Sequence, residues 1–279
     1  MATIFTYLDY RRFLKDVFEE MKSSRTSFSH RAFARMAGFS SSNYVLLVMQ
    51  GKRNLSSDGI VKIARALKLK KAEAEFFEHL VRFNQAASDA ERNVYYARIA
   101  ANRTYAKAKF LEKGQFDYYS TWYVPAIREM VLLEAFREDP AWIAAQLSPP
   151  ITPREADAAL KLLINLELLT RDAAGTLVQQ DRHIASGGEV SSLAMTNFQR
   201  EMIQRAADSI EATPPDLREI GSLTFAVSRD KLIEAKRMIR EFRTRLAGFL
   251  TEESKADAVY QFNIQLFNVS KTAKKEASS

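Results

Sequence analysis

The chain has 279 residues, of which 47% are hydrophobic and 27% are charged, a balance typical of a globular protein with packed cores. It contains no cysteine, which excludes a disulfide framework, a thiolate zinc site and a cysteine nucleophile. No apolar run approaches the ~18 residues of a membrane span, and the first residues lack the pattern of a secretory signal. We therefore expect a cytoplasmic protein of two or three domains that does not associate with membranes.

The formal net charge of +7 is located in the first third of the chain. Residues 1–85 carry 15 Lys and Arg against 8 Asp and Glu, whereas residues 86–279 carry 26 of each kind. Such an asymmetry indicates that the basic segment meets a polyanion, although a solvated basic surface would have the same composition. The motif inside the segment decides between the two interpretations.

Residues 1–85 predict a compact domain of short helices. Apolar residues recur there at helical spacing, and the helices are expected over about 4–21, 30–37, 41–50, 58–67 and 72–83. Ser29, Ser40 and Ser57 are the expected N-caps, while Gly38 and Gly51 are expected to end the second and third helices.

The polar segment 86–115 predicts a helical linker. Ser88 and Glu91 have the spacing of a capping box, in which each side chain satisfies a free backbone donor of the helix N-terminus. The following helix is rich in Ala, Arg and Lys, so we expect it to be solvated rather than docked. The aromatic residues between 95 and 123 are expected to pack this linker onto the second domain.

Residues 116–182 predict a winged-helix-like domain, with three helices followed by strand, turn and strand. Thr152-Pro153-Arg154-Glu155 combines an N-cap, an N1 proline and a capping-box glutamate, so a helix is expected to begin there. The exposed residues of that helix are close to neutral in charge. A structural or dimerising role is therefore favoured over DNA contact, which demands positive charge.

Residues 183–271 predict an α+β unit for dimerisation and effector sensing, and residues 272–279 a polar tail. After a hinge over 181–189 and a helix over about 191–211, the order is strand 222–227, amphipathic helix 230–250 and strand 259–269. A strand, helix and strand in succession predict a parallel crossover. The expected fold class is thus mainly α, with a small α+β part at the C-terminus.

The segment from Phe28 to Tyr44 predicts a helix-turn-helix. Two short helices meet at a tight turn in which Gly38 can take a positive φ angle, and Ala34 and Ala37 are small enough for a close crossing. In such a motif the second helix offers its N-terminal residues to the DNA major groove.

The stretch from Ser29 to Leu69 resembles the helix-turn-helix of Cro/C1-type repressors. The residues that carry the resemblance are Phe33-Ala34, Ala37-Gly38-Phe39-Ser40, Gly51-Lys52-Arg53 and Ile63-Ala64-Arg65-Ala66-Leu67. Most of the chain is also similar to a bacterial family of uncharacterised regulators with a C-terminal domain of unknown function. That second resemblance rests on Tyr7–Arg11, Phe28–Ala34, Gly51–Ser56 and Phe76–Val81.

The resemblance implies DNA binding and assigns the site residue by residue. Ser41, Ser42, Asn43 and Tyr44 would face base edges, where asparagine suits adenine and serine is permissive. Lys52 and Arg53 would contact phosphates, with Arg31 and Arg35 as further candidates, and phosphate contacts make affinity dependent on salt.

The body of the expected recognition helix, Val45–Met49, is unusually apolar. One face must pack inward, yet five apolar residues exceed one face. Either the surplus meets thymine methyl groups or another protein, or it packs under the first helix.

Two other groups of residues are candidates for a catalytic or a ligand-binding site. Asp181, His183 and Ser186 are the residue types of a hydrolase triad, but they crowd into six residues without a nucleophile elbow, so we do not expect an enzyme. Arg237, Arg240 and Arg243 lie on the polar side of the 230–250 helix and could hold an anionic or nucleotide effector, although such a run is more often a solvated face. No metal site or obligate cofactor is expected.

The sequence therefore predicts a homodimeric transcription regulator that binds double-stranded DNA with its first domain. The alternative is an adaptor whose helix-turn-helix binds another regulator. Salt dependence discriminates between them, because phosphate contacts weaken steeply with salt and an apolar protein contact does not.

Overall fold

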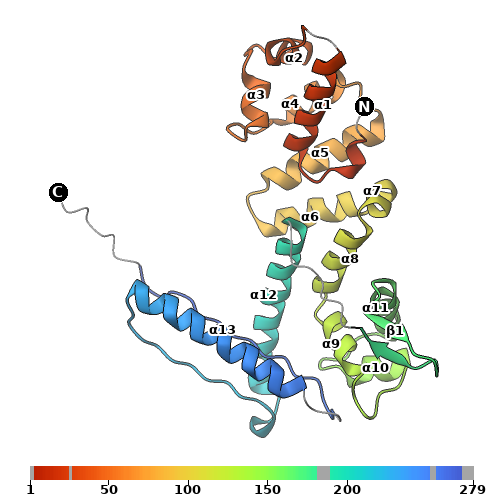
Figure 1. Ribbon diagram of the computed structural model, residues 1–279, viewed down its shortest axis with the longest axis vertical. Helices are drawn as coiled ribbons and strands as arrows, with labels where there is room; N and C mark the ends of the chain where they lie inside the picture. Colours follow the sequence, from red (N-terminus) through yellow and green to blue (C-terminus); the bar gives the residue numbers. More distant parts are fainter. Residues whose placement is uncertain (1–2, 25–26, 181–188, 252–255, 272–279) are drawn as a thin grey trace, which may run out of the picture. The chain divides into compact units, whose positions relative to one another are not determined.

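The computed structural model describes residues 3–24, 27–180, 189–251 and 256–271, and in this part the fold is mainly helical, as expected (Figure 1). The sheet within these residues is a two-stranded hairpin. The predicted hinge, with Asp181, His183 and Ser186, and the predicted tail 272–279 lie outside the described residues. No helix among those described is long and apolar enough to span a membrane.

The first compact unit comprises the residues up to Phe116 and the start of a later helix. After a short 3-10 turn at Ile4–Thr6, its helices are α1 (Tyr10–Ser24), α2 (His30–Met36), α3 (Tyr44–Met49), α4 (Ser57–Ala66), α5 (Lys71–Gln85), α6 (Asp89–Ala100) and α7 (Arg103–Ala108), with α8 (Phe110–Tyr119) at its end. Their core is aromatic, and Tyr10, Phe13, Phe33, Phe77 and Phe83 are among its fully buried side chains.

The first five helices follow the predicted order, but their ends differ from the prediction. The first begins at Tyr10 rather than near residue 4, where the chain forms a short 3-10 turn, and it continues to Ser24. The third helix begins at Tyr44 rather than Ser41, and its N-cap residue is Asn43 rather than Ser40. The fourth is capped by Ser56, whose Oγ accepts a hydrogen bond from the Gly59 backbone N–H at 3.1 Å. The fifth continues to Gln85, two residues beyond the expected end.

The segment expected to be a solvated linker belongs to the first core instead. Helix α6 packs along α5, and Tyr96, Ile99 and Tyr105 are fully buried. The Tyr96 ring lies 5.9 Å from that of Phe83. Because three large side chains are enough to anchor two short helices, the polar overall composition of the segment is a poor guide to its burial.

The second compact unit contains the predicted three helices and hairpin. They are α9 (Tyr123–Met130), α10 (Pro140–Gln146), α11 (Pro153–Asn165), β1 (Leu169–Arg171) and β2 (Leu177–Gln179). The strands are antiparallel, with Leu169 opposite Gln179. The predicted capping box is confirmed: Thr152 N–H donates to Glu155 Oε2 at 2.8 Å, and Glu155 N–H donates to Thr152 Oγ1 at 3.3 Å. These elements enclose their own apolar core.

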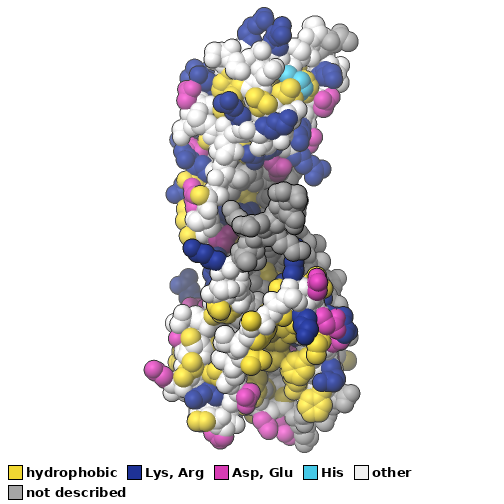
Figure 2. Space-filling model, turned by 90° about the vertical axis from the view of Figure 1, so that its left-hand side faces the viewer, with side chains coloured by type: hydrophobic (Ala, Val, Ile, Leu, Met, Phe, Trp, Pro, Cys, Tyr) yellow, Lys and Arg dark blue, Asp and Glu magenta, His cyan; other side chains and the backbone are white. Residues whose placement is uncertain are grey.

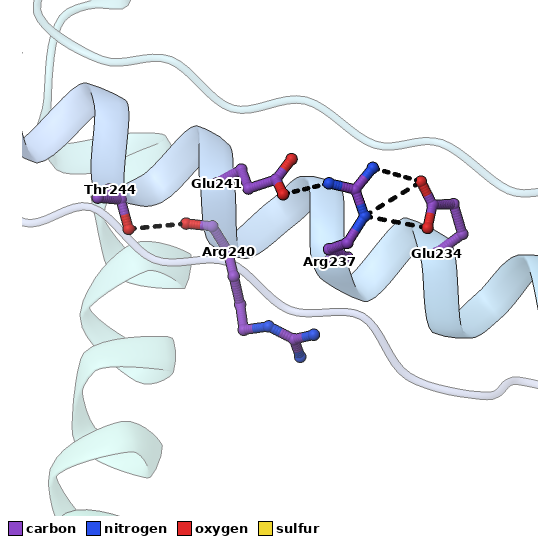
Figure 3. A network of polar contacts seen from close by, with 5 residues as sticks. All are labelled: Glu234, Arg237, Arg240, Glu241 and Thr244. Atoms are coloured by element: carbon purple, nitrogen blue, oxygen red, sulfur yellow. Dashed lines mark hydrogen bonds and ion pairs between the residues drawn. The ribbon is translucent and has the colours of Figure 1, made fainter.

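The C-terminal part differs from the predicted strand, helix and strand. Helices α12 (Glu189–Ala212) and α13 (Arg229–Thr251) form as expected, but residues 222–227 and 259–269 are extended without being strands. Figures 1 and 3 show both segments running alongside α13. A strand exists only where a neighbour completes its hydrogen-bond ladder, and within the described chain neither segment has such a neighbour.

Because the His30 side chain is partly buried, we expect the first unit to be less stable in acid. The His30 ring stacks on Phe18 with centroids 3.9 Å apart, and burial lowers the pKa of His30 below its ordinary value of 6.5. Because the folded state disfavours the protonated form, this stabilisation is complete above pH 6.5 and is lost as the pH falls through 6.5 toward the lower pKa of the folded state.

We therefore expect the urea midpoint of the first unit, followed by far-UV circular dichroism, to fall between pH 7.5 and pH 5.5. His30→Phe should make this fall smaller. An equal fall in both proteins would show that other groups, such as His79, whose pKa burial also lowers, account for it.

Candidate nucleic-acid interface

Helices α2 and α3 meet at the turn that the sequence predicts. Gly38 has a φ of +75°, in the left-handed region that favours glycine. Phe39 N–H donates to the carbonyl oxygen of Ala34 at 2.9 Å, which closes the end of α2. Ala34 and Ala37 are both buried, and α2 packs against α3.

The apolar body of α3 is divided between the core and a half-exposed face. Val45, Val48 and Met49 are buried, whereas Leu46 and Leu47 are half-buried. Helix α3 packs against both α1 and α2, so its apolar residues have two neighbouring helices to meet. Of the two explanations for the surplus of apolar residues, packing under the first helix accounts for most of it.

The four residues expected to face bases lie together at the start of α3. Ser41 and Asn43 are exposed in the turn before the helix, and Ser42 and Tyr44 are half-buried. The Tyr44 ring packs 4.6 Å from that of Phe39, and its hydroxyl donates to the carbonyl oxygen of Asn54 at 2.9 Å. Tyr44 thus supports the loop that follows α3, while the other three side chains offer small polar groups.

The loop after α3 holds Lys52 and Arg53 outward. Gly51 has a φ of +76°, and the backbone N–H groups of Lys52 and Arg53 both donate to the carbonyl oxygen of Leu47, at 2.9 and 3.2 Å. Both side chains are exposed, and no acidic partner is found for either among the described residues. Their charges are therefore available to an external anion.

Arg31 and Arg35 on α2 are likewise exposed, and within the described chain neither has an acidic partner. Lys62 on α4 differs, because Asp58 pairs with it at 2.7 Å. In the upper part of Figure 2, which shows the first unit, Lys and Arg side chains outnumber acidic ones. Helix α2, the Ser41–Asn43 turn and the loop after α3 thus carry four exposed cations that have no acidic partner among the described residues.

Two carboxamides that sequence reasoning missed position this face. Gln85 Oε1 accepts hydrogen bonds from the Tyr10 hydroxyl and the Leu55 N–H, both at 2.7 Å, and Gln85 Nε2 donates to the Leu55 carbonyl oxygen at 2.9 Å. Asn84 Oδ1 accepts from Tyr10 N–H at 3.0 Å. The end of α5 therefore fixes both α1 and the loop that carries Lys52. The sequence signal that could have revealed them is that Asn84 and Gln85 directly follow the apolar residues of α5.

The three arginines considered for an anionic effector do not share one environment. Arg237 pairs with Glu234 and Glu241 on its own helix, whereas the side chain of Arg240 points away from this network (Figure 3). Arg240 and Arg243 line an open cavity together with Lys236, Ile239, Ile264 and Leu266. Only the cavity-lining arginines are available to an anion.

Among the residues that the structure describes, no three His, Asp or Glu side chains are grouped closely enough to hold a metal ion. The Asp181, His183 and Ser186 triad considered from the sequence belongs to the part of the chain outside this description.

Comparisons with known proteins inform the chain from residue 102 onward. A family model described as a domain of unknown function (DUF4423) matches residues 102–269, more than half of the chain. Searches of curated proteins and of solved structures gave no match. The matched region begins after α2 and α3, so it assigns no role to their residues.

Proposed function

The chain belongs to the DUF4423 family, and we propose that it is a sequence-specific transcription regulator that binds double-stranded DNA as a cytoplasmic homodimer. The observation that carries this proposal is the face around α3. Small exposed polar side chains at Ser41 and Asn43 lie between two pairs of cations along the sequence, and neither pair has an acidic partner in the described chain.

The side chains around α3 are chemically suited to bind DNA in the way that Cro/C1-type repressors do. The Asn43 carboxamide has the donor and acceptor needed for adenine N6 and N7 in the major groove, and Ser41 and Ser42 accept several bases. Lys52 and Arg53 in the loop after α3, and Arg31 and Arg35 on α2, would neutralise phosphates and set the register. Half-exposed Leu46 and Leu47 would meet thymine methyl groups.

The second unit has a structural and regulatory part in this proposal. An anionic effector would bind at Arg240 and Arg243, which line the open cavity beside α13. Arg237 is left out of that site, because Glu234 and Glu241 already neutralise it.

The decisive test is fluorescence anisotropy of the full chain with pooled genomic DNA fragments across a salt series. We expect tight binding at low salt that weakens steeply as salt rises. Lys52→Ala/Arg53→Ala should weaken binding to all fragments and reduce the slope of log K against log salt by about 2, because each lost phosphate contact contributes roughly 0.9.

The matched control is Lys107→Ala/Arg137→Ala, which removes the same charge at exposed positions away from the helix-turn-helix. It should leave the slope unchanged. If wild-type protein fails to bind at low salt, or if both double variants lower the slope equally, the proposed interface is wrong. Salt-insensitive capture of another regulator through Leu46 and Leu47 would then favour the adaptor.

A further inference from the structure

The C-terminal part has no core of its own. Among the described residues from Ile203 to Lys271, not one is buried. The exposed large apolar side chains of α13 and its flanking segments are Leu223, Phe225, Val227, Ile233, Met238, Phe242, Phe249, Leu250, Val259, Tyr260, Phe262, Ile264, Phe267 and Val269. Figure 2 shows hydrophobic side chains gathered on the lower part of the molecule, where α13 lies. We call this set the C-terminal apolar surface.

Both extended segments have the side-chain pattern of a half-buried strand. Leu223, Phe225 and Val227 alternate with Ser, Thr and Ala, and the even positions from Tyr260 to Leu266 are apolar while Gln261, Asn263 and Gln265 lie between them. Such an alternation gives each strand one apolar and one polar face. It is the pattern of a sheet with one side covered and the other in water.

The backbone of these segments has no partner in the described chain. No backbone–backbone hydrogen bond joins residues 223–227 or 259–267 to any other described residue. The 259–269 segment is held by side-chain contacts instead: Phe262 lies 6.1 Å from Phe242 of α13, and Asn263 Nδ2 donates to the Met202 carbonyl oxygen at 2.8 Å. Extended chain with free ladder groups is a template for pairing with another strand.

The exposed area is that of a stable interface. Phe225, Phe249 and Tyr260 are 48%, 71% and 69% exposed, and Phe242 and Phe262 are 44% and 48% exposed. At about 150–250 Å² per aromatic side chain, these five alone expose roughly 550 Å², and aliphatic side chains such as Leu223, which is 82% exposed, add to this area. A standard protein–protein interface buries about 800 Å² on each partner, so the C-terminal apolar surface is large enough for one.

We propose that a second copy of this chain covers the C-terminal apolar surface, and that the extended segments of the two copies pair into one intermolecular β-sheet. The two α13 helices cover its apolar face, and the Gln261, Asn263 and Gln265 face stays polar. A second copy fits because it brings two more segments of the same alternation, so that four extended segments are available to pair. Three or more strands with a covered apolar face are what independent stability requires.

This inference deepens the proposed function, since a dimer would present two recognition helices to symmetric half-sites, but its test needs no DNA. Sedimentation equilibrium of the full chain at micromolar concentration should give twice the 31.7 kDa mass of one chain. Phe262→Glu should raise the dissociation constant on the order of 30-fold or more, as expected for loss of a buried anchor side chain. Gln261→Glu, on the polar face, should remain dimeric.

Hydrogen exchange of the wild-type chain tests the sheet itself and does not depend on any variant's folding. Backbone amides of 223–227 and 259–267 should exchange freely at low concentration and become protected, on the order of 100-fold, where the dimer forms. Gln265→Pro, which removes a ladder donor but no apolar side chain, should weaken the dimer more than Gln265→Ala.

Each outcome decides the proposal. A wild-type monomer at high-micromolar concentration overturns it, and a dimer without protection of the two segments overturns the intermolecular sheet. Lys52→Ala/Arg53→Ala should stay dimeric. A protected dimer that binds no DNA would therefore support this inference while removing the proposed function. A monomer that binds DNA would overturn this inference and leave only the DNA-binding part of the proposed function.

Discussion

Phe77→Ala is expected to lower the free energy of unfolding of the first unit by about 3–5 kcal/mol, the range for truncating a buried phenylalanine to alanine. The Phe77 side chain is fully buried on α5, with its ring 6.4 Å from that of Tyr10 and 6.1 Å from that of Phe13 on α1. The alanine would leave a cavity between α1 and α5. Because α3 packs on α1, the loss extends to the face proposed to bind DNA.

Two spectroscopic probes separate this effect from general unfolding. The chain has two tryptophans, Trp122 and Trp142, and both lie in the second unit, so their fluorescence follows that unit alone. In urea, Phe77→Ala should move the circular dichroism transition of the first unit to lower concentration and leave the fluorescence transition unchanged.

The control for this prediction is Val61→Ala on α4, where the valine is 55% exposed. An exposed position away from caps and cores should change the free energy of unfolding by no more than about 0.5 kcal/mol. Equal shifts in both variants, or an equal shift of the fluorescence transition, would show that Phe77 does not anchor the first unit separately.

Local signals in the sequence predicted much of this fold. Caps and stops are decided by a few neighbouring residues, so Ser29, Thr152 and Gly38 are found at the ends of the helices where they were expected. The order of three helices and a hairpin in the second unit also follows from local patterns. The start of α3 was misplaced because Ser40 and Asn43 are both acceptable caps, and three-dimensional packing chooses between them.

Long-range contacts could not be predicted in the same way. Tyr96 and Tyr105 are buried against α5, and no local property of a polar segment shows which helix will receive its aromatic side chains. The prediction of strands over 222–227 and 259–269 is wrong for the single chain, because whether an alternating segment becomes a strand depends on a neighbour. In the proposed dimer, that neighbour lies outside the single chain.

In the candidate site too, the residues set by local sequence could be predicted and those set by long-range contacts could not. Ser41–Asn43, Lys52 and Arg53 could be placed from the motif, because they sit within one short segment and their exposure follows from its geometry. Tyr44 was expected at base edges, and its bond to Asn54 depends on how the loop folds back. Asn84 and Gln85 both contact Tyr10, which lies about 75 positions earlier in the sequence, so a local pattern could not predict these contacts.

Gln85→Leu is the second change with a large expected effect. It removes the acceptor shared by the Tyr10 hydroxyl and the Leu55 N–H, and the donor to the Leu55 carbonyl oxygen. Leucine can satisfy none of these groups, and a buried polar group without a partner costs about 1–3 kcal/mol. Since the three contacts are only partly buried, we expect a loss of roughly 2–4 kcal/mol in the free energy of unfolding of the first unit.

Hydrogen exchange and DNA binding show whether Gln85→Leu only destabilises the first unit or also releases the loop that carries Lys52 and Arg53. If Gln85 positions the loop, the Leu55 amide should lose protection while the amides inside α5 keep theirs, under conditions where the unit is folded. DNA affinity should fall with the salt slope unchanged, because Lys52 and Arg53 are still present but no longer held in place.

Gln85→Glu is the matched variant, since its carboxylate can still accept from the Tyr10 hydroxyl and the Leu55 N–H but cannot donate to the Leu55 carbonyl oxygen. It should restore the protection of the Leu55 amide and recover part of the stability and DNA affinity. If Gln85→Glu and Gln85→Leu behave alike in all three measurements, the acceptor at position 85 does not hold the loop. The face around α3 would then owe its geometry to the packing of α1 against α3 alone.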